Sequence, residues 1–133
     1  MKEIICGLWI GTSNDLFLKE TKTMIHIDCN FNESYLSNDL QTQQFIEKQT
    51  SLVSLLYSNL NKFQKVIVFN SNKNNTLLET HQLIIIAYFI KYTDIKINNL
   101  INLFQKKLQQ PILKNCDSNI YQKIIQQLIQ QYR

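Results

Sequence analysis

The sequence predicts a fold of the α/β class, because a short apolar strand, a polar loop and a fully apolar helix follow one another. Residues 66–69 are β-branched or aromatic and stand between polar residues, which is typical of a buried parallel strand. Residues 83–90 are apolar without a break, but this run is far too short to span a bilayer, so it indicates a helix buried in the core. The polar loop 71–76 between them presents backbone amides at a helix start, a geometry that can bind phosphate.

The composition is that of one folded domain with a mildly basic surface. A chain of 133 residues, of which 44% are hydrophobic, can bury a substantial core. The net charge is +4, but the lysines are scattered and form no basic stripe with interleaved aromatic residues. Nucleic acid is therefore not expected as a partner.

The cysteines indicate a reducing compartment. Cys6, Cys29 and Cys116 have no metal-ligand spacing, so we expect free thiols, no metal and no cofactor. The sequence shows no convincing secretory signal, mitochondrial presequence or transmembrane segment. These features predict a cytoplasmic protein without membrane insertion.

The first residues predict a strand and a short helix. We expect the strand over Glu3–Gly11, which contains both glycines of the chain, and we expect each glycine to serve a backbone conformation in or after that strand. Thr12 or Ser13 can cap a short helix that reaches about Thr21.

The next residues predict two strands and a long helix before the central strand. Met24–Cys29 alternates enough to form a strand, in which we expect His26 to be a hydrogen-bonded core residue rather than a ligand. A very short edge strand is expected at Tyr35–Leu36, followed by a loop. Gln41–Leu60 carries apolar residues at three- and four-residue spacing, which predicts an amphipathic helix.

Two further amphipathic helices are predicted after the buried helix. The first spans Ile97–Leu108, and Pro111 ends it. Asp117 or Ser118 can cap the second. Its inward residues are expected to be Ile120, Tyr121, Ile124, Leu128 and Tyr132.

Several of these stretches resemble the dual-specificity (tyrosine-type) protein phosphatases. In that family a V-hydrophobic-V strand ends in His-Cys, a C-x5-R loop follows, and the helix runs into an A-Y-L-like segment. Here residues 66–68 read VIV, residues 87–89 read AYF, and residues 7–11 read GLWIG where the family commonly has G-L-Y-hydrophobic-G. Pro111 and Asn115 match a later R-P-x-hydrophobic-x-P-N passage, of which the Arg and the second Pro are absent.

The resemblance runs end to end and implies a particular fold. It implies a dual-specificity-phosphatase-like single domain over residues 1–133. Its central, mostly parallel sheet would have about four to five strands, flanked by helices on both faces.

The residues that carry catalysis in the family have no counterpart at the matching positions. Asn70 takes the position of the nucleophilic Cys, and Thr80 takes that of the phosphate-binding Arg. Nine residues lie between Asn70 and Thr80, where the family has five. A thiolate and a bidentate guanidinium are what attack and hold the phosphoryl group. The resemblance therefore implies an inactive member, a pseudophosphatase.

Asp39 has two interpretations. It stands at the spacing from Asn70 at which the family holds its general-acid Asp. Together with Ser37 and Asn38, it could instead cap the next helix. An acid without a nucleophile would catalyse nothing by the family's route in either case.

The loop after the central strand also has two interpretations. Thr76 and Glu79 form a T-x-x-E capping box, in which the glutamate charge stabilises the helix start as an anion would, so no anion is expected there. The alternative is a ligand site in which a lysine and several amide side chains contact phosphate. Its candidate residues are Ser71, Asn72, Lys73, Asn74, Asn75 and Thr76. We expect the neighbouring His81 to contact the core rather than this loop.

Two functions follow from these observations. The first is a non-catalytic phosphatase-like domain that serves as a structural or protein-interaction subunit of a larger assembly, with a protein as its partner. The alternative is a phospho-ligand-binding module that reads phosphorylated residues without hydrolysing them. A cytoskeletal or ciliary assembly is compatible with the first function, but no residue selects it.

Overall fold

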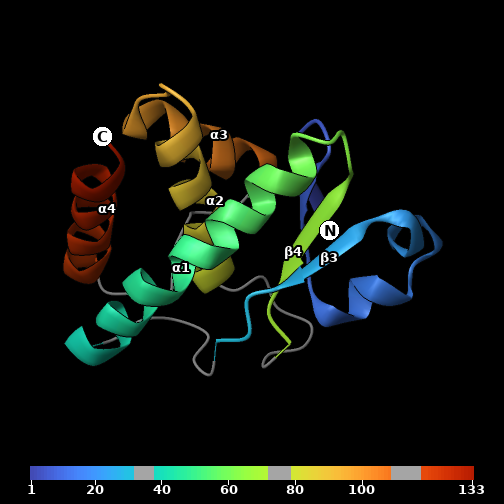
Figure 1. Ribbon diagram of the computed structural model, residues 1–133, viewed down its shortest axis with the longest axis horizontal. Coiled ribbons are helices and arrows are strands. Elements are labelled where there is room, and N and C mark those ends of the chain that lie inside the picture. Colours follow the sequence, from blue (N-terminus) through green and yellow to red (C-terminus); the bar gives the residue numbers. More distant parts are fainter. Residues whose placement is uncertain (32–37, 72–78, 109–117) are drawn as a thin grey trace.

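A four-stranded mixed sheet and four α-helices make up the part of the fold that the computed structural model describes, residues 1–31, 38–71, 79–108 and 118–133 (Figure 1). The α/β prediction is confirmed. In chain order, the elements are β1 (Lys2–Ile5), β2 (Leu8–Ile10), the 3-10 segments η1 (Ser13–Phe17) and η2 (Lys19–Thr23), β3 (Ile25–Asp28), α1 (Asp39–Leu60), β4 (Val66–Phe69), α2 (Glu79–Tyr92), α3 (Ile97–Leu108) and α4 (Ser118–Tyr132).

The sheet has the strand order β1-β2-β4-β3. β1 and β2 form an antiparallel hairpin, whereas β4 is parallel to both of its neighbours, β2 and β3. The central strand β4 is buried at all four positions, as the sequence predicts for a strand covered on both faces. Because β2, β4 and β3 run in the same direction, their carboxyl ends meet at one edge of the sheet.

The predicted strand over Glu3–Gly11 is a hairpin rather than one strand. Gly7 lies in its turn at φ +89°, a conformation that favours glycine, and its N–H donates to Glu3 Oε2 at 3.1 Å. Gly11 meets a different constraint after β2, since a Cβ there would lie 2.7 Å from Asp15 Oδ2. Both glycines therefore serve the backbone, one through its dihedral angle and the other through a close approach.

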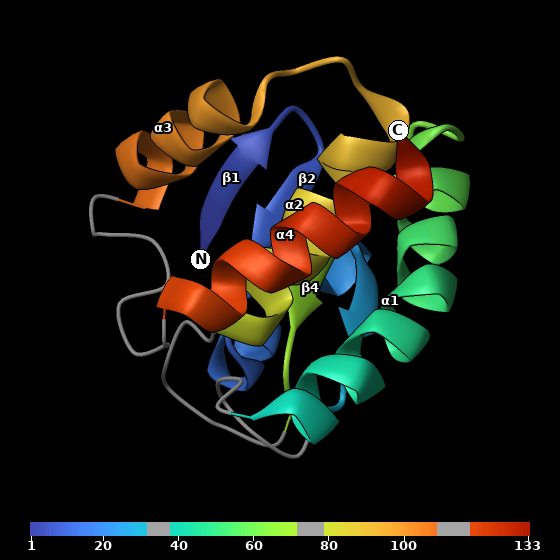
Figure 2. The ribbon, with the colours of Figure 1, turned by 90° about the vertical axis from the view of Figure 1, so that its left-hand side faces the viewer.

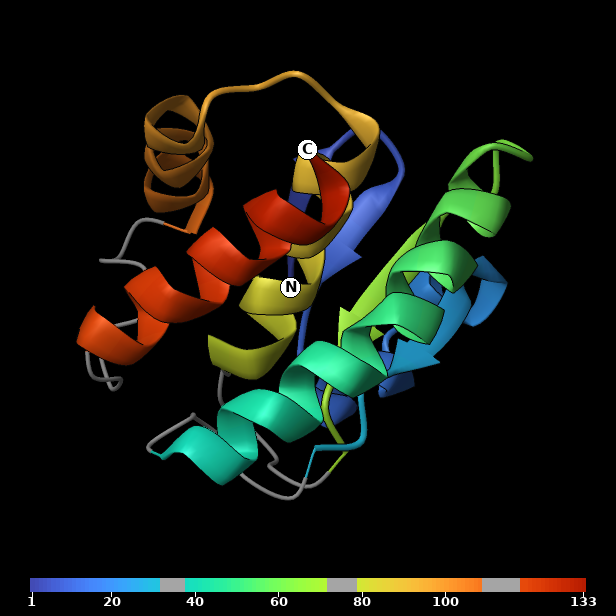
Figure 3. The ribbon, with the colours of Figure 1, turned by 60° about the vertical axis from the view of Figure 1, so that its left-hand side comes forward.

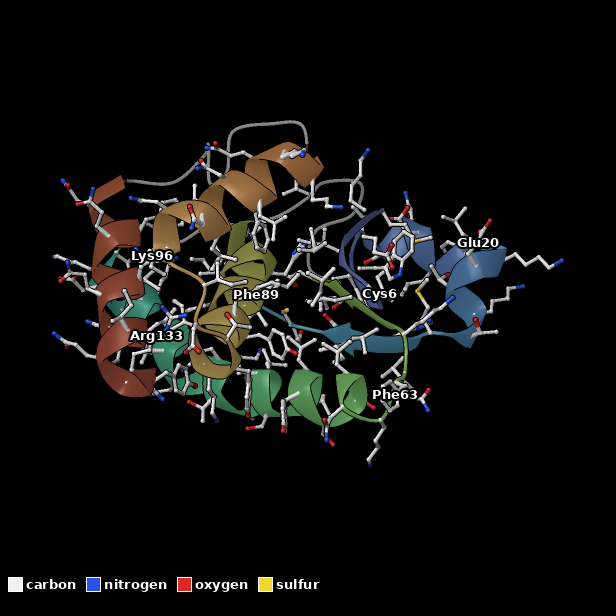
Figure 4. The ribbon with its side chains drawn as sticks, turned by 90° about the horizontal axis from the view of Figure 1, so that it is seen from above. Cys6, Glu20, Phe63, Phe89, Lys96 and Arg133 are labelled. Carbon is white, nitrogen blue, oxygen red and sulfur yellow. The ribbon has the colours of Figure 1, made fainter. Side chains whose placement is uncertain are left out.

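The two faces of the sheet are covered differently. Side chains in register make the rows Leu8, Val66, Ile25 and Ile10, Val68, Ile27 on one face, and the row Trp9, Ile67, His26 on the other. The α-helices lie on the first face, whereas η1 and η2 lie on the second (Figures 1 and 4). Helices were expected on both faces, and a short helix was expected up to Thr21. In the described part of the chain, the second face carries only 3-10 turns, which follow Thr12.

Helix α2 forms the middle layer of the molecule, between the sheet and α4 (Figures 2 and 3). Ten of its residues, Thr80–Ala87, Phe89 and Ile90, are buried, which confirms the prediction of a core helix. It packs against α1, α4 and α3. None of the helices in the described ranges is long and apolar enough to cross a membrane.

The amphipathic helices α1, α3 and α4 match their predicted positions. α1 begins two residues before the expected Gln41, because the side chain of Asn38 caps it by accepting from Gln41 N–H at 2.9 Å. α3 has the expected bounds, and Tyr121, Ile124 and Leu128 of α4 are buried. The expected strand at Tyr35–Leu36, the expected caps at Thr76 and Asp117, and the expected helix end at Pro111 lie outside the described residues.

Candidate functional site

The candidate site lies at the edge of the sheet where the parallel strands end, which we call the carboxyl edge. Crevices at this edge are where open α/β sheets usually bind ligands. β3 ends at Asp28, and β4 is followed by Asn70 and Ser71. Asn70 and Ser71 therefore stand at the carboxyl edge.

Asn70 and Thr80, the two residues matched in the sequence to the family's Cys and Arg, lie together. Both are buried, and Asn70 Nδ2 donates to Thr80 Oγ1 at 3.5 Å, a long hydrogen bond. Asn70 Oδ1 accepts from the N–H of Phe31 at 3.2 Å. This amide joins the end of β4 to the segment after β3 and to the first turn of α2. A neutral carboxamide in this role is a structural bridge and offers no nucleophile.

A carboxylate already binds the first amide of the loop. Asp28 Oδ1 accepts from the N–H of Ser71 at 3.0 Å and from that of Asn30 at 2.9 Å. A backbone N–H that a phosphate would use therefore points at a protein carboxylate. Ser71 is the only one of the candidate loop ligands that the structure describes, because residues 72–78 lie outside the described ranges.

Cys29 places a thiol at the carboxyl edge, next to Asn70. Its N–H donates to the carbonyl oxygen of Phe69 at 2.8 Å, and its side chain is fully buried. Burial raises the pKa of this thiol far above its ordinary value, the charge of Asp28 raises it further, and Lys48 opposes the shift. The sulfur is therefore protonated near neutral pH, a form in which a thiol is a poor nucleophile.

Asp39 is the first residue of α1 and faces solvent. Its side chain is 92% exposed and lies 4.0 Å from Lys123 Nζ of α4. The cap of the helix is the side chain of Asn38, so Asp39 acts instead as a favourable negative charge in the first turn. Among the described residues, its carboxylate contacts neither Asn70 nor Thr80.

The two histidines differ in environment. His81 is buried, and desolvation lowers its pKa to about 3, so its ring is neutral at physiological pH. The expected core position of His81 is confirmed. The expected core position of His26 is wrong, because this residue is exposed. The expected hydrogen bond is confirmed, since Nε2 donates to the carbonyl oxygen of Thr21 at 2.7 Å. No group of three His, Cys, Asp or Glu side chains in the described ranges could hold a metal ion.

Sequence reasoning missed the contact between Asp28 and Ser71. These residues are 43 positions apart and meet only because β3 and β4 are parallel neighbours. A usable signal was that Asp28 stands next to the end of one predicted strand and Ser71 follows another, since the carboxyl ends of parallel strands share an edge.

Comparisons with known proteins assign this chain to no family. No family model matches it, and neither a curated protein nor a solved structure is significantly similar to it. The function therefore has to be inferred from the contacts of the residues themselves.

Proposed function

We propose that this chain is a non-catalytic, phosphatase-like domain that acts as a structural or protein-interaction subunit of a larger assembly. The observation that carries the proposal is the position of Asn70, buried at the end of β4 with its side-chain amide bonded to Phe31 and Thr80. In a phosphatase of the tyrosine type, this position supplies the attacking sulfur. Here the side chain stabilises the junction of a strand, a loop and a helix.

The position of the single arginine of the chain supports the same proposal. Arg133 Nε donates to the carbonyl oxygen of Ile90 at 2.9 Å, and its Nη2 donates to that of Thr93 at 2.7 Å. The guanidinium thus satisfies carbonyl groups at the end of α2. Thr80 lies about 15 Å away along the helix axis, given a rise of about 1.5 Å per residue. The arginine is therefore committed to a structural role far from the carboxyl edge.

The alternative, a module that reads phosphorylated residues, is less well supported. A phosphate at the start of this loop would have to displace the Asp28 carboxylate from the amide of Ser71. It would then lie beside that carboxylate, and like charges at such distances repel. A reader would instead keep such amides free for its ligand.

The test is a turnover assay with a small aryl phosphate, run on the purified chain and on Cys29→Ser as its matched variant. We expect no phosphate release above the buffer rate from either protein. Turnover by the chain would contradict the proposal, and its loss in Cys29→Ser would identify the sulfur responsible.

A phosphopeptide titration separates the proposal from its alternative. The probes are phosphotyrosine and phosphoserine peptides with their unphosphorylated counterparts. Equal, non-saturable signals for each pair are expected. Saturable binding that requires the phosphate group would replace the proposed function with the phospho-ligand reader.

A further inference from the structure

A groove opens at the opposite edge of the sheet, between the β1–β2 turn and the turn that joins α1 to β4. Its volume is about 570 Å³. The hairpin contributes Cys6, the end of α1 contributes Leu60 and Phe63, and α2 contributes Tyr88. We call this surface the hairpin groove. It shares no residue with the candidate site at the carboxyl edge.

Phe63 has a backbone conformation that is unfavourable for a residue with a side chain. Its φ is +61°, in the left-handed region. The Phe63 N–H bonds to Leu60 O at 3.0 Å and the Gln64 N–H to Asn59 O at 3.2 Å, the Schellman pattern that ends many helices. Glycine is the usual residue at this position, because a side chain in the left-handed region is strained.

Burial does not compensate for this strain, because the Phe63 side chain is 97% exposed. Figure 4 shows it beyond the end of α1, at the margin of the molecule. Glycine or asparagine at position 63 would serve the fold at least as well as this exposed phenylalanine does. Strain of this kind points to a role outside the fold, such as contact with another molecule.

Aromatic rings continue the wall of the hairpin groove away from Phe63. Tyr88 lies 5.4 Å from Tyr92 between ring centroids, and Tyr92 stacks on Tyr57 at 4.1 Å with an interplanar angle of 9°. The Tyr57 side chain is 41% exposed. Rings held by stacking lose little freedom when another molecule covers them, and tyrosine is enriched among the residues that dominate binding energy.

The charges around Phe63 are positive and unpaired. Lys62 and Lys65 are exposed, and neither lies within 4.0 Å of a carboxylate in the described part of the chain. The one acidic residue that lines the groove, Glu3, uses its carboxylate to accept from the N–H of Gly7. An apolar hollow beside two free ammonium groups is complementary to an apolar side chain flanked by carboxylates.

We propose that the hairpin groove docks a short segment of a partner protein. An apolar side chain of that segment fills the hollow beside Phe63, and acidic residues next to it pair with Lys62 and Lys65. This inference deepens the proposed function and rests on it, since it identifies the surface through which the subunit would be held.

Two other occupants fit the surface less well. A second copy related by a two-fold axis would bring this same positively charged surface against itself, and like charges across an interface are unfavourable. A flat bilayer would cover Phe63 and the lysines but would leave the hollow unfilled. A convex, acidic protein segment satisfies the charge and the shape together.

The test begins with a random displayed-peptide library, selected on the full chain. The expected consensus is an apolar residue flanked by Asp or Glu. The consensus peptide is then titrated against the wild type, Phe63→Asn and the double variant Lys62→Glu/Lys65→Glu. Both variants should lose about tenfold or more in affinity, as for residues that dominate an interface.

Phe17→Ser is the matched control, because Phe17 is 83% exposed on η1, on the far face of the sheet. It should bind the consensus peptide as the wild type does. Phe63→Asn should also melt at the wild-type temperature or roughly 2–4 °C above it, because asparagine tolerates the left-handed conformation. A residue needed only for folding would show the opposite pattern, with lower stability and unchanged binding.

Several results would overturn the inference. One is a selection that yields no acidic-apolar consensus, and another is equal binding by wild type and Phe63→Asn. Phe63-dependent sedimentation with vesicles of phosphatidylcholine and phosphatidylserine would assign the surface to a membrane, and Phe63-dependent dimerisation would assign it to a second copy. The proposed non-catalytic function fails separately, through turnover of aryl phosphate, so the two failures are distinguishable.

Discussion

The two edges of the sheet use their side chains in opposite ways. At the carboxyl edge, polar groups are bonded to one another: Asn70 bonds to Thr80 in a buried site, and Asp28 bonds to the N–H of Ser71 at the surface. At the hairpin groove, Phe63 is strained and exposed, and the neighbouring lysines lack carboxylate partners in the described ranges. The hydrogen bonds at the first edge stabilise the fold, whereas the backbone strain at Phe63 destabilises it. Changes at the carboxyl edge should therefore alter folding, and changes at the groove should alter binding.

The largest expected difference between the two edges is in thiol reactivity. Cys29 is buried at the carboxyl edge and Cys6 is exposed in the hairpin turn. On a Cys116→Ser background, an aromatic disulfide reagent should modify Cys6 at once and Cys29 ~10³-fold or more slowly, because Cys29 reacts only when the structure opens. Fast modification of Cys29 in the native state would show that the carboxyl edge is open.

Replacing Asn70 should give the next largest effect. Asn70→Ala leaves the N–H of Phe31 and the hydroxyl of Thr80 without their partner in a buried site. Unfolding free energy should fall by about 2–3 kcal/mol, since buried polar groups that lose a partner are costly. Urea denaturation measures the change, and Ser71→Ala is the control, because the Ser71 side chain is exposed and only its backbone N–H bonds to Asp28. Equal stabilities would show that Asn70 does not bridge the edge.

Stability should also depend on pH through His81. Its pKa is about 3 in the folded chain, against 6.5 for an ordinary histidine. Below pH 6.5 the unfolded chain binds the proton and the folded chain does not, so stability falls as the pH falls towards 3. Between pH 7 and pH 5 the loss from this residue should be about 2 kcal/mol.

His81→Gln isolates this contribution from the carboxylates that titrate in the same range. Urea midpoints of the variant and the wild type are compared at pH 5 and pH 7. The variant should show the smaller decrease. Parallel curves would mean that the His81 ring is protonated as readily in the fold as in the unfolded chain.

The smallest expected effect compares two aspartates. Asp28→Asn keeps an oxygen that can accept from Ser71 but removes the charge, so it should cost about 1 kcal/mol. Asp39→Asn removes only an exposed pair at 4.0 Å and should cost less than about 0.5 kcal/mol. Thermal melts of both variants show which loses more stability. A greater loss in Asp39→Asn would show that Asp39 contributes more to the fold than an exposed ion pair does.

Local patterns in the sequence explain the helices and the central strand better than they explain the site. The apolar spacing of α3 predicts both of its ends, Ile97 and Leu108, because its packing depends on one face of one helix. The hairpin is missed because Glu3–Gly11 reads as one nearly continuous apolar run, interrupted only by Gly7. His26 is exposed because the 3-10 turns cover only part of the second face: Ile67 in the same row is buried and His26 is not. Alternation along a strand does not reveal this.

Features that depend on strand order or backbone dihedrals were not predictable. The bond between Asp28 and Ser71 needs β3 beside β4, and pairing of this kind is set by the packing of the whole sheet. The sequence does not predict the left-handed conformation of Phe63, because neither Gly nor Asn, the residues that usually adopt it, stands at that position. By contrast, the resemblance drew attention to Asn70 and Thr80, although the hydrogen bond between them was not predicted.

The measurement that tests the closed carboxyl edge most directly is thermal melting of the purified chain with increasing phenyl phosphate. Sodium chloride at equal ionic strength controls for salt. A ligand that binds the folded state at 100 times its Kd stabilises it by about 2.7 kcal/mol, which is a shift of several degrees. We predict no shift beyond the salt control. A saturable, phosphate-specific rise in the melting temperature would contradict the account.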